Sequence, residues 1–322
     1  MSTQKIRFGI VGTGTIAHRF AEAIKNVSNA ELVAVASRTK ENAEKFGDEF
    51  NIPVRFDSYE KMAQSDKIDA AYIAVPHSGH IECSCLMMNH GKSVICEKPI
   101  SMNKEDVDRV YSTAEKNNVK FMVAHVLRFW PEYELLKEIF DTKKYGKLLS
   151  GTMTRLGCYP KWSWDGWMMD EKRSGLVPFD LHIHDLDYMV YAFGKPQVAY
   201  QYRSKLPDQD FITINYNFGD FSINTEASWY ATSYPFTAEF RFQFEDAVVA
   251  NENGKMIIYL RNDEKIDLSA EAEGDTGDIN LPKSDAYANE IKYFFDCIEN
   301  DKPVDKFDPE ELKCVLDIIN NL

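Results

Sequence analysis

The sequence predicts two domains: a doubly wound α/β domain over residues 1–126, and an α+β domain with an open, mainly antiparallel sheet over residues 127–322. Strand and helix patterns alternate up to about Val126, which is typical of a parallel sheet with helices on both faces. From Gly146 onward the pattern becomes rich in strands. The chain of 322 residues is longer than one hydrophobic core usually supports, so two domains are expected.

The first predicted strand runs directly into a glycine turn. Residues 6–11 form an alternating apolar strand, followed by Gly12, Gly14 and Ala17 in the spacing G-x-G-x-x-A. Gly12 permits a tight turn, Gly14 lets the backbone approach a pyrophosphate at the positive end of the next helix, and Ala17 allows close helix packing. A structural turn without a ligand produces the same pattern. The predicted cofactor-binding residues here are Gly12, Thr13, Gly14, Thr15 and Ile16.

The second strand, residues 30–36, follows one helix later, as a βαβ unit requires. It ends at Ser37 and Arg38, where an NAD site normally has an acidic residue for the ribose hydroxyls. A hydroxyl followed by a guanidinium instead suits the extra phosphate of NADP. NADP is therefore the expected cofactor and NAD remains possible, while the alternative is that Arg38 is a solvated charge at the strand end.

The remaining parallel strands lead to a lysine at the edge of the sheet. They are predicted over residues 69–75, 93–96 and 120–123, with helices over residues 82–89 and 104–117. The strand at 93–96 ends in Glu97, Lys98 and Pro99, at a carboxyl end where doubly wound folds bind ligands. Lys98 could stabilise a developing alkoxide there. A solvated lysine is the alternative.

Strands dominate the second half of the chain. They are predicted over residues 147–157, 197–204, 211–218, 221–229, 236–244 and 255–260. Between Phe236 and Phe244 apolar and polar residues alternate, which indicates a sheet with one buried face. A wide open sheet often covers its polar face by association, so a homodimer or homotetramer is expected. Residues 275–277 are predicted as a loop, and helices return over residues 285–299 and 308–320.

A helix opened by Pro178 carries further polar residues. A step of 100° per residue places four of them on one stripe, namely Asp180, His184, Asp187 and Tyr191. Asp180 and His184 are one turn apart and could act as an orienting carboxylate and an imidazole general base. A helix-capping aspartate with a surface histidine fits the spacing equally well. His182 falls on the apolar side and is interpreted as a core histidine with a satisfied hydrogen bond, not as a metal ligand.

Composition limits the possible partners and compartment. The chain has 37 basic and 51 acidic residues, giving a net charge of −14, which disfavours binding to nucleic acid. Its 6 cysteines include no C-x-x-C pair and are interpreted as reduced core thiols. We find neither a signal sequence nor an apolar run of membrane-spanning length. We expect a cytoplasmic protein that binds a small molecule, with no metal, no nucleic acid and no membrane partner.

The motifs together resemble those of one family. Over essentially its whole length the chain is similar to the Gfo/Idh/MocA oxidoreductases, which include glucose-fructose oxidoreductase, inositol dehydrogenase, anhydrofructose reductase and dimeric dihydrodiol dehydrogenase. The resemblance rests on Gly12-x-Gly14-x-x-Ala17, on Ala74-Val75-Pro76 with His80, on Glu97-Lys98-Pro99, and on Gly175 to Asp180 with His184 and Asp187. It implies a nicotinamide-binding Rossmann domain and a second domain whose open sheet mediates oligomer formation.

The resemblance also implies roles for individual residues. The family's catalytic lysine falls on Lys98, its substrate-orienting aspartate on Asp180 and its acid/base histidine on His184. Tyr287 resembles the family's tyrosine near the nicotinamide. Further cofactor contacts are expected from Ala74, Pro76, His77, His80, Glu97, Lys98, His125 and Arg128. The chain departs from the family in having His77 where Asn is frequent, His182 where Gly is frequent and Met168 where Arg is common, which leaves the substrate contacts open.

The expected activity is hydride transfer between a nicotinamide and a secondary alcohol or carbonyl of a small sugar, polyol or related cyclic substrate. Besides Lys98, Asp180 and His184, the expected substrate contacts are Tyr159, Trp162 and Trp167, whose rings could cover a sugar. An aromatic loop packed into the core or into a subunit contact explains these rings equally well. The alternative functions are reduction of an aromatic or dihydrodiol-type substrate, and a non-catalytic nucleotide sensor on the same fold.

Overall fold

The chain folds into two compact units, which the computed structural model describes over residues 5–269 and 286–322. The first unit holds the described residues up to Val126 together with residues 286–316, and the second holds residues 127–269 and 317–322. From the sequence we expect all residues after 126 in the second domain, so the structure differs for residues 286–316. This segment belongs to the first unit because helix α9 (Ala286–Glu299) packs on α1 (Thr15–Ala23) and on the 3-10 helix η1 (Ile24–Asn26).

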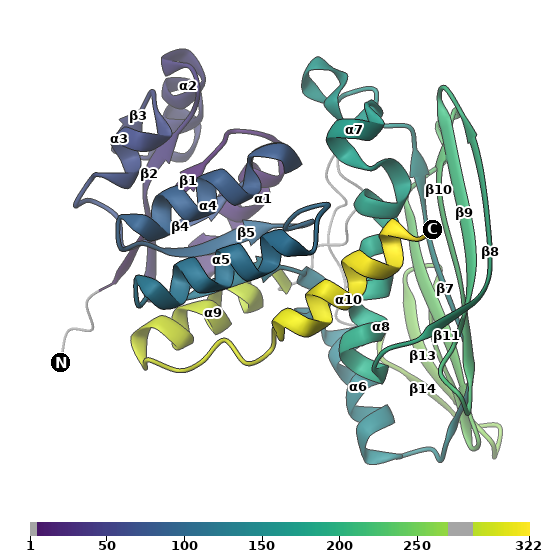
Figure 1. The fold of residues 1–322 in the computed structure, drawn as a ribbon. Coiled ribbons are helices and arrows are strands. Elements are labelled where there is room, and N and C mark those ends of the chain that lie inside the picture. Colours follow the sequence, from purple (N-terminus) through teal and green to yellow (C-terminus); the bar gives the residue numbers. More distant parts are fainter. Residues whose placement is uncertain (1–4, 270–285) are drawn as a thin grey trace. The chain divides into compact units, whose positions relative to one another are not determined.

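A parallel sheet of six strands forms the centre of the first unit, in the order β3-β2-β1-β4-β5-β6 (Figure 1). This confirms the predicted doubly wound sheet. Strand β3 was not predicted, because three half-buried residues at a sheet edge carry no readable periodicity. The strands are β1 (Ile6–Val11), β2 (Ala30–Ala36), β3 (Val54–Phe56), β4 (Ala70–Ile73), β5 (Ser93–Glu97) and β6 (Phe121–Ala124).

Helices cover both faces of this sheet (Figure 1). Right-handed crossovers place α1 and α2 on one face and α4 and α5 on the opposite face. All six strands therefore end at the same edge, where the predicted cofactor-binding residues follow β1, β2, β4, β5 and β6. The remaining helices are α2 (Lys40–Phe50), α3 (Tyr59–Ala63), η2 (His77–Gly79), α4 (His80–Asn89), α5 (Glu105–Lys116) and α10 (Pro309–Asn320), the last of which ends in the second unit.

The second unit contains a sheet of eight strands in the order β14-β13-β12-β11-β7-β10-β9-β8. Only the pair β7 and β10 is parallel among its neighbouring strands, so the sheet is mainly antiparallel, as predicted. Two short strands, β12 and β14, were not predicted. The strands are β7 (Leu148–Cys158), β8 (Gln197–Leu206), β9 (Gln209–Asn217), β10 (Ser222–Tyr230), β11 (Thr237–Phe244), β12 (Ala247–Glu252), β13 (Lys255–Leu260) and β14 (Lys265–Asp267).

One face of this sheet is buried under helices. Alternate residues of β9 and β11 point to this face, including Ile212, Ile214, Phe240 and Phe242. Phe240 packs edge-on against Tyr133 of α6 (Pro131–Thr142), with ring centroids 5.0 Å apart. This contact fixes α6, and with it α8 (Ile183–Phe193), on the sheet.

The helical segments of the second unit precede and follow β7. They are η3 (Val126–Phe129), α6, η4 (Trp164–Met169), α7 (Glu171–Ser174), the π-helix η5 (Pro178–His182) and α8. The predicted loop at residues 275–277 lies outside the described residues. Within residues 5–269 and 286–322, no helix has the length and apolar character needed to cross a bilayer.

Candidate active site

The glycine turn after β1 is shaped for close backbone contact. Gly12 has a positive φ of 107°, and a Cβ placed there would lie 2.3 Å from the carbonyl oxygen of Ala74. Gly14 begins α1, and a Cβ at Gly14 would meet nothing within 4 Å among the described atoms. The amino end of α1 therefore opens onto free space, while the turn behind it is closed. This cradle fits a pyrophosphate held by backbone N–H groups.

The end of β2 presents one buried and one exposed polar residue. Ser37 is buried, and its N–H donates to the carbonyl of Phe56 at 3.1 Å. Arg38 is exposed, and the next residue, Thr39, caps α2 by accepting from the N–H of Asn42 at 3.4 Å. Burial raises the pKa of the nearby Tyr59, and the positive charge of Arg38 opposes that rise. The guanidinium thus lies exposed at the end of β2, as an NADP phosphate contact requires.

His80 ties two turns of the first unit together. Its ring is buried, with Nδ1 2.7 Å from the carbonyl oxygen of Pro99 and Nε2 2.8 Å from that of Val75. Burial lowers the pKa of His80 to about 4, although both carbonyl contacts oppose that change; the neutral ring can donate to only one of the two carbonyls. A hydrogen bond from His80 to a cofactor, as expected from the sequence, would have to replace one of these backbone contacts. Of the neighbouring predicted contacts, Ala74 and His77 are buried, and Pro76 is half-buried.

The end of β5 exposes a single lysine. Within residues 93–100 every residue is buried except Lys98, which is half-exposed. The carboxylate of Glu97 accepts a hydrogen bond from the hydroxyl of Tyr72, and its Oε2 accepts from the backbone N–H of Lys98 at 3.2 Å. The Lys98-Pro99 peptide bond is cis. The half-exposed side chain of Lys98 therefore leaves a buried turn at the carboxyl edge of the sheet.

Two further predicted cofactor contacts belong to the first unit. His125 follows β6 directly and is buried, and Tyr287 is half-exposed in the first turn of α9. Arg128 belongs to the second unit, and there its guanidinium is fully buried. It forms a two-point ion pair with Asp187, at 2.9 and 2.7 Å, and lies over the ring of Tyr191 at 4.5 Å.

Of the four polar residues predicted to share one helix stripe on the second unit, the structure leaves three half-exposed and buries Asp187. Residues 178–182 form a π-helix, not the α-helix expected from Pro178, and α8 follows. Within residues 178–193 the half-exposed side chains are Asp180, His184, Tyr191 and Phe193. Asp187 does not join them, because its carboxylate is buried against Arg128. The structure thus presents Asp180 and His184 on a helix that is otherwise mostly buried.

Buried polar contacts with the sheet hold both ends of this π-helix. The N–H of Val177 donates to Oδ2 of Asp210 at 3.1 Å, and Asp210 also pairs with Arg203 at 2.8 and 2.9 Å. His182 Nε2 lies 2.6 Å from the hydroxyl of Tyr216. His182 is fully buried, as expected of a core histidine, and burial lowers its pKa to about 3; Nε2 has this hydrogen bond, whereas Nδ1 has no partner among the described residues.

Sequence reasoning missed the residues that anchor this helix. Asp210 occupies an inward position of β9, in register with the buried Ile212 and Ile214. Arg155 lies inward on β7 and pairs with Asp185 of α8 at 2.7 Å, with both side chains buried. A charged residue at an inward position of an alternating strand is the signal that could have identified both.

The three aromatic residues predicted to contact substrate differ in their exposure. Tyr159 packs edge-on against Trp229, with centroids 5.7 Å apart, and donates to the carbonyl of Pro207 at 2.7 Å. Trp162 is 62% exposed and its neighbour Trp164 is 59% exposed, so neither is part of the core. Trp167 is half-exposed in η4, where Asp165 pairs with Arg173 at 3.2 Å.

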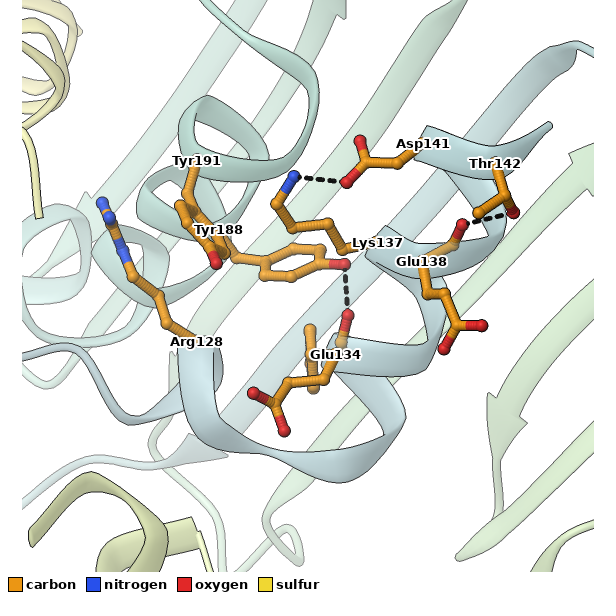
Figure 2. A pocket seen from close by; sticks show the side chains of 9 residues that line it. Arg128, Glu134, Lys137, Glu138, Asp141, Thr142, Tyr188 and Tyr191 are labelled. Atoms are coloured by element: carbon orange, nitrogen blue, oxygen red, sulfur yellow. Dashed lines mark hydrogen bonds and ion pairs between the residues drawn. The ribbon is translucent and has the colours of Figure 1, made fainter. Parts of the chain in front are cut away.

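A pocket of about 320 Å³ lies between α6 and α8 (Figure 2). Its walls carry Tyr191 with Arg128 beside it, and the ammonium of Lys137 pairs with Asp141 at 2.8 Å across one turn of α6. Neither Asp180 nor His184 lines it. This pocket is therefore separate from the predicted catalytic residues.

Comparison with known proteins defines the class. Residues 6–125 match the family described as "Oxidoreductase family, NAD-binding Rossmann fold", and residues 133–251 match the "GFO/IDH/MocA C-terminal domain". The uncharacterized oxidoreductase YgjR of Escherichia coli is 32% identical over 69% of this chain and 70% of its own length. The open turn at Gly14 and the half-exposed Lys98, which lie at the same edge of the parallel sheet, fit an oxidoreductase family with an NAD-binding Rossmann fold. The chain belongs to the GFO/IDH/MocA family.

Two further proteins are similar to this chain, one in sequence and one in fold. The NADP(+)-dependent scyllo-inositol 2-dehydrogenase IolU of Bacillus subtilis is 41% identical, over 41% of this chain and 40% of its own length. The matched segment therefore spans less than half of the length of that relative. A levoglucosan dehydrogenase solved with NADH and levoglucosan shares the fold with a TM-score of 0.83 and 18% identity, over 98% of this chain and 95% of the other.

The two glycines of the turn make a matched test of cofactor binding. Gly14→Ala should leave the melting temperature unchanged but weaken NADP(H) binding on the order of tenfold or more, because its Cβ enters the space for the pyrophosphate. Gly12→Ala should destabilise the fold by more than about 1–2 kcal/mol, because it adds a clash with Ala74 to a strained φ. Thermal melts and coenzyme titration measure both effects. Undiminished binding in Gly14→Ala would contradict the assignment of the turn.

Proposed function

We propose that this chain is an NAD(P)-dependent dehydrogenase or reductase that acts on a CH–OH group of a small cyclic polyol or sugar. The observation that carries the proposal is the pairing, at one sheet edge, of the open cradle at Gly14 with the half-exposed Lys98. Family membership supports adding Asp180 and His184, the polar side chains that remain half-exposed at the start of α8.

Each residue has a distinct chemical task. A bound nicotinamide takes or returns the hydride. In the oxidation direction His184 takes the hydroxyl proton as general base, and the ammonium of Lys98 stabilises the alkoxide. Asp180 orients the substrate hydroxyls and the imidazole. In the reduction direction the imidazolium of His184 returns the proton to the carbonyl oxygen.

The substrate class follows from the relatives and from the aromatic loop. The two relatives act, by their names, on an inositol and on levoglucosan, both cyclic molecules rich in hydroxyl groups. The exposed ring of Trp162 and the half-exposed ring of Trp167 offer apolar faces on which such a ring can stack. Tyr159, which precedes both in the same loop, packs against Trp229. A panel of polyols, sugars and dihydrodiol-type aromatics separates this class from the aromatic alternative. Absence of turnover across the panel would favour a nucleotide sensor.

Removal of either catalytic side chain should abolish most of the turnover. Lys98→Ala and His184→Ala should each lower kcat by on the order of a hundredfold or more, because general acid/base and alkoxide stabilisation are lost. Coenzyme affinity should change little. The measurement is the reduced-nicotinamide absorbance with the best substrate of the panel.

Matched controls exist for both substitutions. Lys92→Ala removes a lysine just before β5, at the opposite end from Lys98, and His90→Ala removes an exposed histidine at the end of α4. Both controls should keep full turnover. Equal turnover in Lys98→Ala and Lys92→Ala would remove Lys98 from the mechanism.

The preference for NADP is proposed to depend on Arg38. Arg38→Ala should raise the KM for NADP(H) on the order of ten- to a hundredfold, the value of a charge-assisted phosphate contact, with the KM for NAD(H) nearly unchanged. Lys40→Ala, two residues further on and also exposed, is the control. Steady-state kinetics with both coenzymes measure these KM values. An equal rise in the KM for NAD(H) would show that Arg38 does not bind the extra phosphate.

The open face of the eight-stranded sheet is proposed to pair with a second copy of the chain. Tyr200 and Tyr202 of β8 are 60% and 53% exposed, and they pair with Asn215 and Thr213, which lie on the face opposite the buried Ile214. A broad, flat face carrying exposed aromatic rings is typical of an interface between subunits.

Charges placed on this face should separate the subunits. The double substitution Tyr200→Glu and Tyr202→Glu should convert a dimer or tetramer to a smaller species, because like charges would meet across the interface. Tyr145→Glu serves as a control at a site away from β8. Light scattering coupled to gel filtration gives the masses. A native protein that elutes as a monomer would overturn the proposal.

A further inference from the structure

Three buried polar side chains, of Tyr72, Glu97 and Glu290, lie within electrostatic range of one another in the first unit. Tyr72 of β4 stacks on Phe20 of α1, with ring centroids 3.9 Å apart, which places its side chain on the face that α1 covers. In the register of β4 and β5, Tyr72 lies opposite Ile95, so Glu97, two residues further along β5, shares this face. Helix α9 packs on α1 and brings Glu290 to the same group.

The carboxylate of Glu97 has the bonding pattern of an ionised group. One oxygen accepts from the hydroxyl of Tyr72 and the other from the backbone N–H of Lys98. A carboxylate that accepts at both oxygens is stabilised in its charged form even when it is buried. Glu97 is 7% exposed, so its charge sits in a nearly dry site, directly before the lysine proposed as catalytic.

Glu290 is a second carboxyl group in this dry site. It is 1% exposed, and its Oε1 has no hydrogen-bond partner among the described residues. A buried carboxylate without a partner is costly, and the charge of Glu97 nearby raises that cost. The two carboxyl groups therefore cannot both be ionised at low cost, and the one that lacks donors should keep the proton.

We propose that Glu290 is a protonated carboxylic acid in the native protein, and that it leaves Glu97 as the single anion that fixes the backbone of Lys98. Glu290 is then a positioning residue, because it acts on Lys98 only through Glu97. Ionisation of Glu290 would place a second negative charge in the cluster and loosen the hold of Glu97 on the turn. Its effect on catalysis rests on the proposed function, whereas its protonation state does not.

The surrounding charges agree with this assignment. Burial, followed by the charge of Glu97, raises the pKa of Glu290 well above its usual value. Burial also raises the pKa of Tyr72, with Glu97, Glu290 and Tyr287 adding to the rise, so Tyr72 remains a donor. The basic residues of α1 and η1 lie at more exposed positions: His18 is 3.3 Å from Glu49, Lys25 is 2.9 Å from Glu22, and Arg19 is half-exposed.

A raised pKa in the folded state has a defined effect on stability. The contribution is complete below the unfolded pKa of about 4.3 and is lost as the pH rises through the folded pKa. Over that range the folding equilibrium constant should fall about tenfold for each pH unit on account of Glu290 alone. A neutral glutamine at this position removes that loss.

Unfolding measured against pH tests the proposal without any substrate. Glu290→Gln should be as stable as the native protein near about pH 4 and progressively more stable than it as the pH rises above the unfolded pKa of about 4.3. Glu299→Gln, at the exposed end of the same helix, is the matched control and should follow the native curve. Parallel curves for the native protein and Glu290→Gln would overturn the proposal.

Infrared spectroscopy tests the protonated group directly. At neutral pH the native protein and Glu299→Gln should show the C=O stretch of a dry carboxylic acid that Glu290→Gln lacks. If Glu290→Gln does not fold, Glu290→Asp, which keeps an acid at this position, should shift that band. A band unchanged by substitution at residue 290 would show that Glu290 is ionised or uninvolved.

The pH profile of turnover tests the link to Lys98. In the native protein kcat should fall as the pH rises through the folded-state pKa of Glu290, and Glu290→Gln, which cannot ionise at this position, should lack that fall. An unchanged profile would refute the positioning role even if the infrared result held. If no substrate is turned over, the proposed function fails, and the infrared and unfolding results still decide the state of Glu290.

Discussion

The first unit depends on the close approach of β1 and β4 at their carboxyl ends. The backbone of Gly12 lies where any side chain would meet the carbonyl of Ala74, and the N–H of Ala74 donates to Val11 at 2.8 Å. From Ala74 the connection continues through His80, which contacts the backbone of both Val75 and Pro99. A continuous set of buried backbone contacts therefore links the cofactor turn to the lysine turn. Because its parts are linked in this way, the proposed hydride-transfer site would have its cofactor turn and its lysine held in fixed positions relative to each other.

In the second unit, side-chain contacts hold the helix that carries Asp180 and His184 against the sheet. Helix α8 and the π-helix before it carry buried polar groups, and the sheet supplies a partner for each of three contacts: Arg155 for Asp185, Asp210 for Val177 and Tyr216 for His182. The buried ion pair between Arg155 and Asp185 contributes little net stability, but truncating either partner should be strongly destabilising because a charge is left without compensation. These contacts hold one face of the helix against the sheet, and they leave Asp180 and His184 half-exposed.

The parts of the fold and site that could be predicted are those with a local signature. The turn at Gly12 and Gly14, the alternation of β11 and the position of His182 among apolar residues each follow from spacing within one element. The π-helix at Pro178, the strand at Val54 and the membership of α9 in the first unit depend on partners distant in the sequence. Local periodicity does not contain those partners. The pairing of Arg128 with Asp187 joins residues 59 positions apart, so neither could be recognised as an anchor by spacing alone.

In the proposed function, Lys98 and His184 act on one oxygen atom of the substrate. A crystal structure of the protein with NADP⁺ and scyllo-inositol tests this claim most directly. We expect Lys98 Nζ and His184 Nε2 both within about 2.6–3.2 Å of the same hydroxyl oxygen, on the carbon that faces the nicotinamide C4. A bound polyol whose reacting hydroxyl lies beyond the reach of either side chain would contradict the account.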